Sequence, residues 1–376
     1  MGGTCTRSVT PTWRLLAGMT AVVLLAGCGA GVNATPTPAA PTATSVPSAA
    51  VITPTSAATA TPAPTPTAPA PTPTSQPSPT PLAVVETLDV AYESANALLA
   101  PGVLDVYTPA KAGPWPVVVM FHPDPAYNSK GYLREYARRV ANLGFVAFVP
   151  AWGQMPDGSG AAVTYDTLRA VNAQAACAVA FARAHAAQYG GNTATMIVFG
   201  HSAGAERAAM VAFARPKPSA GCLGNPTLGA IDALVTYEGD WILGGASSRA
   251  LEADPRVLDV ATPWKYLAAH KDLTVVLLVS SNPGLPDRVF ADAKAVDAFF
   301  ALRDPSGALR KQLDANGALA DGSVSFMENQ QLLASVLKAQ GNPVRFEVLP
   351  RSAHTFWTDD GWKVFLAAFK KATGSG

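Results

Sequence analysis

The sequence predicts an α/β fold for residues 84–376, with a mostly parallel central sheet flanked by helices. Short apolar runs of strand length alternate with longer amphipathic runs of helix length from Val84 onward, which is the pattern of a parallel sheet covered by helices. No internal repeat is visible along this alternation. The pattern therefore indicates one α/β domain.

Each expected element follows from a local signal. "VVVMF" (117–121) is an apolar run typical of a buried strand. "KGYLREYARRVANLG" (130–144) is amphipathic and stops at a glycine, as a helix does. Further strands are expected in 145–150, 195–199, 230–239, 273–281 and 343–350. Further helices are expected near 166–189, 203–213, 290–302, 326–340 and 361–371.

The N-terminal residues 1–27 have the layout of an export signal. Arg7 and Arg14 precede an apolar run from Leu15 to Ala26, which is short for a membrane span. "LAGC" (25–28) resembles the bacterial lipobox, and this resemblance implies cleavage before Cys28 and a lipid on that cysteine. An ordinary secretory signal and an uncleaved anchor are the alternatives.

Residues 28–83 are expected to form a disordered tether. Pro, Thr, Ala and Ser make up almost all of residues 33–81, and no charged residue occurs between Leu15 and Val85. Such a composition cannot bury enough apolar surface to offset the entropy lost on ordering. We therefore expect a lipid-anchored domain outside the cytoplasm, in the periplasm or on the cell surface, which meets the membrane through its anchor only.

Net charge and cysteine content bear on which partners the protein binds and on whether it forms a disulfide. A formal net charge of +1 offers no electrostatic footprint for nucleic acid. Of the four cysteines, only Cys177 and Cys222 fall within the expected domain. In an exported protein such a pair should form a disulfide, worth about 4 kcal/mol in the chain-entropy model. Two separately buried thiols are the alternative.

"GHSAG" (200–204) stands between an expected strand and an expected helix. A Gly-X-Ser-X-Gly sequence in that context forces a tight turn, which needs small residues around the serine and exposes its hydroxyl above the sheet. The amides at the helix N-terminus would stabilise a developing oxyanion. Ser202 is therefore the candidate nucleophile, and a purely structural turn is the alternative.

At these residues the sequence resembles the α/β-hydrolase superfamily, specifically its esterase and lipase-like members. "CAVAFARAHAAQYGGNTATMIVFGHSAG" (177–204) resembles their helix, turn, strand and nucleophile elbow, and "VLPRSAH" (348–354) resembles their last strand and histidine loop. The resemblance implies a serine, an acid and a histidine in that chain order. His354 then follows as the base, in preference to His122, His185, His201 and His270.

The resemblance leaves the acid open. The family places it after the seventh strand, here 274–281, where Asp287 is near enough. Residues 321–354 also resemble a complete acid, helix, strand and histidine unit, with a capping box at Ser325 and Glu328, so Asp321 is favoured. That interpretation makes residues 282–320 an insertion and a candidate lid. Asp240 is a third candidate, after the sixth strand.

The oxyanion hole is expected to use the backbone N–H of Ala203 and a second donor after the third strand. The sequence "FHPDPAYN" (121–128) departs from the family's "HG" there, and Pro123 has no N–H to donate. Asp124 is the expected donor in its place. If Pro123 spoils the hole, the fold could instead serve as a non-catalytic binding module.

These observations predict an exported serine hydrolase that acts on small or polymeric carboxylic esters. A peptidase or a dienelactone-hydrolase-like enzyme are the alternatives among enzymes. No set of His, Cys and carboxylate residues has metal-ligand spacing, and no dinucleotide loop follows the early strands, so no metal or cofactor is expected. The oligomeric state is not predicted. Aromatic residues near strand ends could line a pocket or pack the rim: Trp152, Tyr237, Trp241, Phe356 and Trp357.

Overall fold

The computed structural model describes residues 82–94, 99–123, 130–153, 163–224, 227–239, 241, 254–282, 288–304, 306–315, 317, 319–320, 322–355 and 357–374. All of them lie in one compact unit, formed by residues 75–376. The expected signal, the tether and the lipidated Cys28 lie outside the described residues, so they stay predictions.

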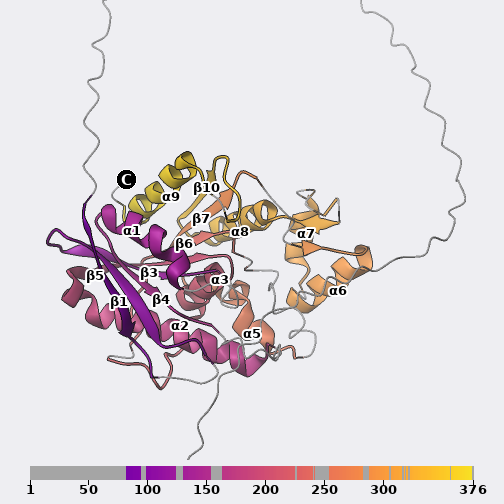
Figure 1. The fold of residues 1–376 in the computed structure, drawn as a ribbon. Helices are drawn as coiled ribbons and strands as arrows, with labels where there is room; N and C mark the ends of the chain where they lie inside the picture. The colour runs from indigo at the N-terminus through magenta and orange to yellow at the C-terminus, as the bar shows by residue number, and fades with distance from the viewer. Residues whose placement is uncertain are drawn as a thin grey trace, which may run out of the picture. The chain divides into compact units, whose positions relative to one another are not determined.

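An eight-stranded sheet forms the centre of this unit (Figure 1), with the strand order β1-β2-β4-β3-β5-β6-β7-β10. The first two strands are antiparallel to their neighbours, and all the following pairs are parallel. The strands are β1 (Val84–Ala91), β2 (Val103–Pro109), β3 (Trp115–Phe121), β4 (Val146–Pro150), β5 (Gly191–His201), β6 (Ala233–Tyr237), β7 (Thr274–Ser280) and β10 (Val344–Leu349).

Helices cover both faces of the sheet, because successive strand residues point to opposite sides. On one face, strand residues such as Val118 and Phe199 pack against α1 (Arg134–Asn142) and α9 (Asp359–Ala372). On the other face, residues such as Val119 and Val198 pack against the remaining large helices. These are α2 (Tyr165–His185), α3 (Ala203–Ala209) with its π-helical continuation η3 (Met210–Ala214), and α8 (Phe326–Gln340).

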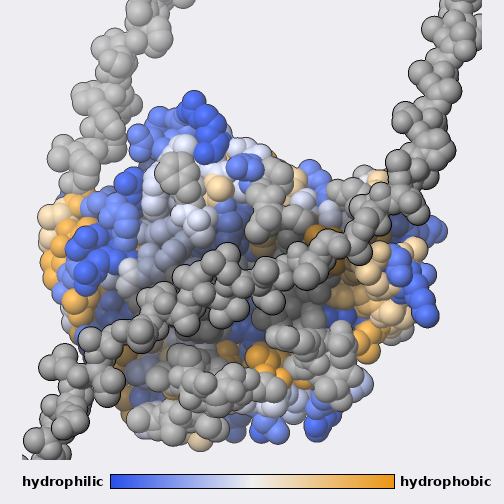
Figure 2. Space-filling model, turned by 45° about the vertical axis from the view of Figure 1, so that its right-hand side comes forward, coloured by the Kyte–Doolittle hydropathy of each residue, from blue (hydrophilic) through white to orange (hydrophobic). Residues whose placement is uncertain are grey.

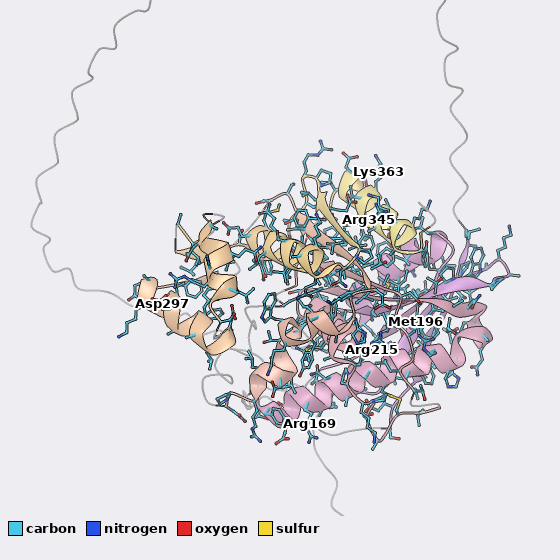
Figure 3. All side chains as sticks on the ribbon, turned by 180° about the vertical axis from the view of Figure 1, so that it is seen from behind. Arg169, Met196, Arg215, Asp297, Arg345 and Lys363 are labelled. Atoms are coloured by element: carbon cyan, nitrogen blue, oxygen red, sulfur yellow. A yellow bond between two sulfur atoms is a disulfide. The ribbon has the colours of Figure 1, made fainter. Side chains whose placement is uncertain are left out.

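Short helical segments complete the framework. The 3-10 turns are η1 (Lys130–Leu133), η2 (Ala186–Tyr189) and η5 (Pro263–Ala269), and α5 (Val257–Ala261) precedes the last of these. Figure 3 shows the opposite face of the molecule: Met196 of β5 lies among the packed side chains of the sheet, while Arg169 and Lys363 lie at the rim.

A segment with two helices separates β7 from α8, in the region that the choice of Asp321 as the acid makes an insertion. It contains α6 (Ala293–Arg303) and α7 (Ala308–Ala315), which lie beyond α8 at the side of the unit (Figure 1). Its two ends meet in a small antiparallel sheet, β8 (Arg288–Val289) with β9 (Ser323–Val324). The end of the insertion thus leads directly into the first turn of α8.

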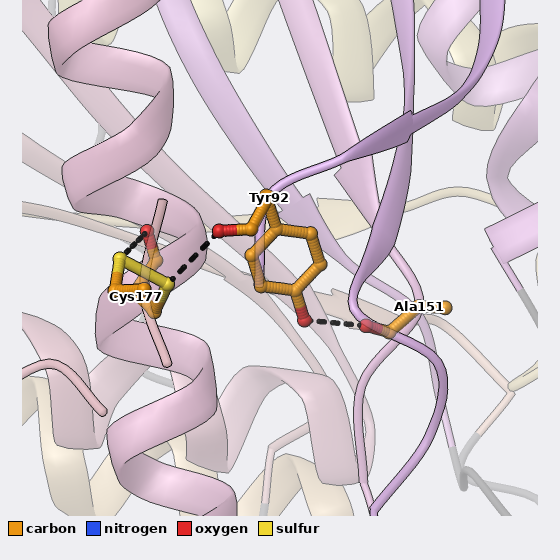
Figure 4. Close-up of a disulfide and its surroundings, with 4 residues drawn as sticks. Tyr92, Ala151 and Cys177 are labelled. Carbon is orange, nitrogen blue, oxygen red and sulfur yellow. Dashed lines mark hydrogen bonds between the residues drawn. A yellow bond between two sulfur atoms is a disulfide. The ribbon is translucent and has the colours of Figure 1, made fainter. Parts of the chain in front are cut away.

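A disulfide joins Cys177 of α2 to Cys222, 45 positions later, with a Cα–Cα distance of 5.4 Å. This is the pair that the sequence predicts. Cys177 Sγ lies 3.4 Å from the carbonyl oxygen of Tyr92, and the Tyr92 hydroxyl donates a 2.7 Å hydrogen bond to the carbonyl of Ala151 (Figure 4). The disulfide therefore sits where α2 meets the chain that follows β1.

The described surface is mixed in polarity. In Figure 2 hydrophobic residues lie between hydrophilic ones over the part of this face that is not grey. Among the described residues, the large hydrophobic ones with exposed side chains are Val85, Leu88, Leu223, Val289 and Val348. Within the described part of the chain, no helix combines the length and the apolar character needed to cross a membrane.

The six strands expected from the sequence are all present, and helix α8 has the predicted bounds and the predicted capping box. The strand expected at 195–199 is longer, because β5 also pairs with β3 at Gly191 and Asn192, and pairs with β6 from Ile197 to His201. Among the described residues, β1, β2, α5, η5, α7 and the β8–β9 pair were not predicted from the sequence.

Candidate active site

Ser202 lies at a sharp turn between β5 and α3. Its backbone has φ 55° and ψ −124°, a strained conformation for a residue with a side chain. A Cβ atom on Gly200 would come within 2.1 Å of the Gly204 carbonyl oxygen, and one on Gly204 within 2.3 Å of the Phe121 carbonyl oxygen. Both glycines are therefore required by close packing, as expected for a nucleophile elbow.

The C-terminal end of β6 is the centre of the site. The carbonyl oxygen of Tyr237 accepts a 2.9 Å hydrogen bond from the backbone N–H of Ser202. The hydroxyl of the same tyrosine donates a 2.7 Å bond to the carbonyl oxygen of Ala353, the residue before His354. One residue therefore links the backbone at the serine to the histidine loop.

His354 lies in the loop between β10 and α9, and a third of its side chain is exposed. Its ring centroid is 4.8 Å from that of His201, the neighbour of Ser202 in the chain. The structure thus brings the predicted base to the elbow.

The partner of His354 is Glu238, which directly follows β6. Its Oε2 lies 2.5 Å from Nδ1 of His354, and its side chain is almost fully buried. The backbone N–H of Ser280, the last residue of β7, donates a 2.7 Å bond to Oε1, and the Ser280 hydroxyl donates to the same oxygen. Both carboxylate oxygens are therefore held by neutral or cationic donors.

Glu238 also has a strained backbone, with φ 48°. Its N–H donates a 3.0 Å bond to the carbonyl oxygen of Leu278 in β7. A carboxylate at Nδ1 fixes the tautomer of the imidazole, so that Nε2 is left free to accept a proton. Glu238 thus lies where a carboxylate could orient the imidazole of His354.

Glu238 was not among the acids predicted from the sequence. Asp321 was favoured, followed by Asp287 and Asp240, and all three lie outside the described residues. The position that they were expected to fill, at Nδ1 of His354, is taken by Glu238. A signal was present: Glu238 follows a fully buried strand that is next to β5 in the sheet.

The structure describes one of the two residues expected to form an oxyanion hole. Ala203 is the first residue of α3, so its N–H is among those without a partner inside the helix. His122 follows β3 as a buried residue, and its Nδ1 is 2.8 Å from the carbonyl oxygen of Pro123. Asp124, the expected second donor, lies outside the described residues.

His201 is fully buried beneath the site. Its ring contacts those of Tyr237, Tyr132 and His354, with centroids 4.7, 5.6 and 4.8 Å away. Burial, and secondly the charge of His354, hold the pKa of the His201 imidazole well below its ordinary value. His201 therefore stays neutral beside the base.

The other histidines and the aromatic residues singled out in the sequence are placed as follows. His185 stacks on Phe181, with ring centroids 4.1 Å apart. Burial lowers the pKa of the His270 imidazole, which lies after η5. Among the aromatic residues, Trp152, Tyr237, Trp241 and Trp357 are buried, and Phe356 lies outside the described residues. In the described part of the chain, no group of three His, Cys, Asp or Glu side chains is arranged to hold a metal ion.

The sheet order, the elbow at Ser202 and the loop positions of Glu238 and His354 define an α/β-hydrolase fold. Residues 104–220 match the BD-FAE family. No curated protein sequence matches the chain.

Solved structures agree on the fold. Esterase B from Lactobacillus rhamnosis has a TM-score of 0.54 at 15% identity, over 78% of this chain and 86% of that one. A form of that enzyme inhibited with a tributyrin phosphonate gives the same values. A bifunctional GH43-CE protein from Bacteroides eggerthii has a TM-score of 0.52 at 14% identity, over 77% of this chain and 38% of that one.

Proposed function

We propose that this chain is a serine hydrolase of carboxylic esters, with Ser202 as nucleophile, His354 as base and Glu238 as orienting acid. The observation that carries the proposal is the bond between Glu238 and Nδ1 of His354, made beside a strained serine at the strand–helix turn. The esterase names of the similar structures support the same reaction class.

In this mechanism His354 Nε2 takes the proton of the Ser202 hydroxyl as Oγ bonds to the ester carbon. The carbonyl oxygen becomes an oxyanion beside the N–H of Ala203. Collapse of this intermediate breaks the ester C–O bond, and the leaving alcohol takes the proton from the His354 imidazolium. Water, deprotonated by His354, then attacks the acyl-enzyme and releases the acid, and Ser202 regains its proton.

The buried carboxylate of Glu238 lies at Nδ1, opposite the imidazolium that forms in each step. Ser280 holds the other oxygen of the carboxylate, so the acid does not rotate away from the base. Small ester substrates, as the tributyrin phosphonate of the inhibited relative suggests, are the substrate class that we assign.

The test uses turnover of p-nitrophenyl esters of graded acyl length, together with labelling by a fluorophosphonate. We expect one label per chain at Ser202, and we expect Ser202→Ala to abolish both labelling and turnover. Ser335→Ala, at an exposed serine of α8, is the matched control and should behave as wild type. Turnover and labelling that survive Ser202→Ala would contradict the assignment. A wild-type protein without either activity would favour a binding module.

We also propose that the enzyme is exported and anchored through a lipid on Cys28, because the lipobox-like "LAGC" precedes the uncharged tether. Mass spectrometry of protein from a bacterial host should find a mature chain that begins at a lipidated Cys28. Cys28→Ala should leave the precursor unprocessed. If the wild-type chain keeps residues 1–27, the proposed export and lipid anchoring are contradicted.

A further inference from the structure

Helix α8 begins at the edge of the sheet that carries the site. Ser325 caps it: the Ser325 hydroxyl accepts a 3.2 Å hydrogen bond from the N–H of Glu328, and the Glu328 carboxylate accepts a 2.7 Å bond from the N–H of Ser325. This reciprocal capping box fixes the backbone of the first turn. The side chain of the first helical residue, Phe326, is therefore set in a defined place.

That side chain lies against the proposed base. The ring centroids of Phe326 and His354 are 4.9 Å apart, and the ring planes differ by only 11°. This is an offset-stacked pair, with the π face of the phenyl ring turned toward the imidazole. Tyr237 and His201 contact the same imidazole from the main sheet, with centroids 6.3 and 4.8 Å away.

A second contact ties α8 to the acid. Gln330 lies one helical turn after Phe326, on the same side of the helix. Its side chain is fully buried, and its Nε2 donates a hydrogen bond to the carbonyl oxygen of Gly239, the residue after Glu238. The first two turns of α8 therefore contact both the base and the loop of the acid, although neither residue belongs to the serine–histidine–acid set.

We propose that Phe326 is a positioning residue, whose π face stabilises the imidazolium of His354 during acyl transfer. The inference rests on the proposed function, because only a base that takes up a proton in the reaction gains from this contact. A cation over an aromatic face is attracted by the negative potential of the ring, whereas a neutral imidazole gains less.

The contact therefore strengthens between the ground state and the transition state. An interaction of that kind raises kcat and leaves KM almost unchanged. The ordinary strength of a cation–π contact corresponds to roughly a two- to thirty-fold effect on rate. Glu238, Tyr237 and His201 also face the imidazole, and none of them is altered by a change at position 326.

The decisive variant is Phe326→Leu, which keeps an apolar side chain but removes the π face. We expect kcat for p-nitrophenyl acetate to fall roughly two- to thirty-fold with little change in KM. The acid limb of the pH profile of kcat/KM should move to lower pH, because the imidazolium has lost a stabilising neighbour. Phe326→Tyr and Phe326→Trp keep an aromatic face and should restore both quantities.

The matched control is Phe290→Leu. Phe290 is also half-buried, but its ring contacts Phe299 and Phe300 inside the insertion, with centroids 5.3 and 6.4 Å away. Phe290→Leu should show a loss of stability similar to that of Phe326→Leu, but the acid limb of its pH profile of kcat/KM should stay where it is in the wild type.

The outcomes separate the two proposals. A wild-type protein that neither turns over esters nor labels at Ser202 refutes the proposed function itself. If the wild type is active and Phe326→Leu has the wild-type kcat and pH profile, the role of Phe326 is refuted and the function stands. That role is refuted equally if Phe326→Tyr and Phe326→Trp are as impaired as Phe326→Leu.

Discussion

Glu238 and His354 are 116 positions apart in the chain, and Oε2 of the first lies 2.5 Å from Nδ1 of the second. The parallel sheet brings them together, because β6 and β10 flank β7 and release their loops at the same edge. Tyr237, the residue before Glu238, also binds the histidine loop through its hydroxyl. The end of β6 therefore determines how His354 and Glu238 are aligned.

Glu238→Gln should lower kcat about 10³- to 10⁴-fold while the protein stays folded. Glutamine keeps the shape of the side chain, but its amide no longer balances the imidazolium, and it can favour the wrong tautomer of His354. Turnover of p-nitrophenyl acetate, with circular dichroism to monitor the fold, measures the effect.

Asp321→Asn, Asp287→Asn and Asp240→Asn are the comparison set, since each keeps shape and removes one charge. We expect near-normal kcat in all three, because Glu238 already occupies Nδ1 of His354. If kcat collapses in one of them while the Glu238→Gln protein stays active, that aspartate is the acid and Glu238 is not.

Ser280→Ala should lower kcat about ten-fold, because it removes the hydroxyl that donates to Glu238 Oε1 and leaves only the backbone N–H. Ser280→Thr keeps the hydroxyl and should retain most of the activity. Ser281→Ala removes a hydroxyl at the exposed next position and serves as the control. Equal kcat values for Ser280→Ala and Ser281→Ala would show that the carboxylate needs no second donor.

The sequence was most informative where a signal is local. "VVVMF", the elbow at Ser202 and the capping box of α8 each depend on neighbouring residues, and each matches the structure. The carboxylate that meets His354 depends on which strand lies next to which, and that arrangement is set by long-range pairing. In the sequence, Glu238 is only the end of the strand-like run "TYEG", and it was therefore missed. Its importance follows from β6 being the neighbour of β5 in the sheet. The edge strand β1 was missed because it has neither a continuous nor an alternating apolar pattern: its apolar residues Val85 and Leu88 are exposed, whereas Glu86 is half-buried.

Removing the disulfide should cost stability but not catalysis. Cys177→Ala with Cys222→Ala opens a loop of 45 positions, and we expect a loss of about 2–4 kcal/mol in the free energy of unfolding. Urea unfolding with and without reductant measures it, and the wild type under reductant should approach the double variant. Among the described residues, the two sulfurs contact the carbonyl oxygens of Tyr92 and Cys177 rather than Ser202 or His354, so kcat should be unchanged. If kcat fell together with stability, the disulfide would also be needed for catalysis.

His201 should make the folded protein sensitive to acid. Its pKa is lowered in the folded state by burial and by the charge of His354, whereas an unfolded chain binds a proton near pH 6.5. Below that pH the unfolded state therefore holds more protons, and stability falls as pH falls, by at most about 1.4 kcal/mol per pH unit. Above it the contribution vanishes.

His201→Phe keeps an aromatic ring between Tyr237 and His354 but cannot bind a proton. Urea unfolding of both proteins at pH 7.5 gives the constant cost of repacking the larger ring. At pH 6 and pH 5 the free energy of unfolding of the variant should rise relative to that of the wild type. The rise should grow as the pH falls, by at most about 1.4 kcal/mol per pH unit. A difference between the two proteins that stays the same at all three pH values would show that His201 takes up a proton as easily in the folded state as in the unfolded one.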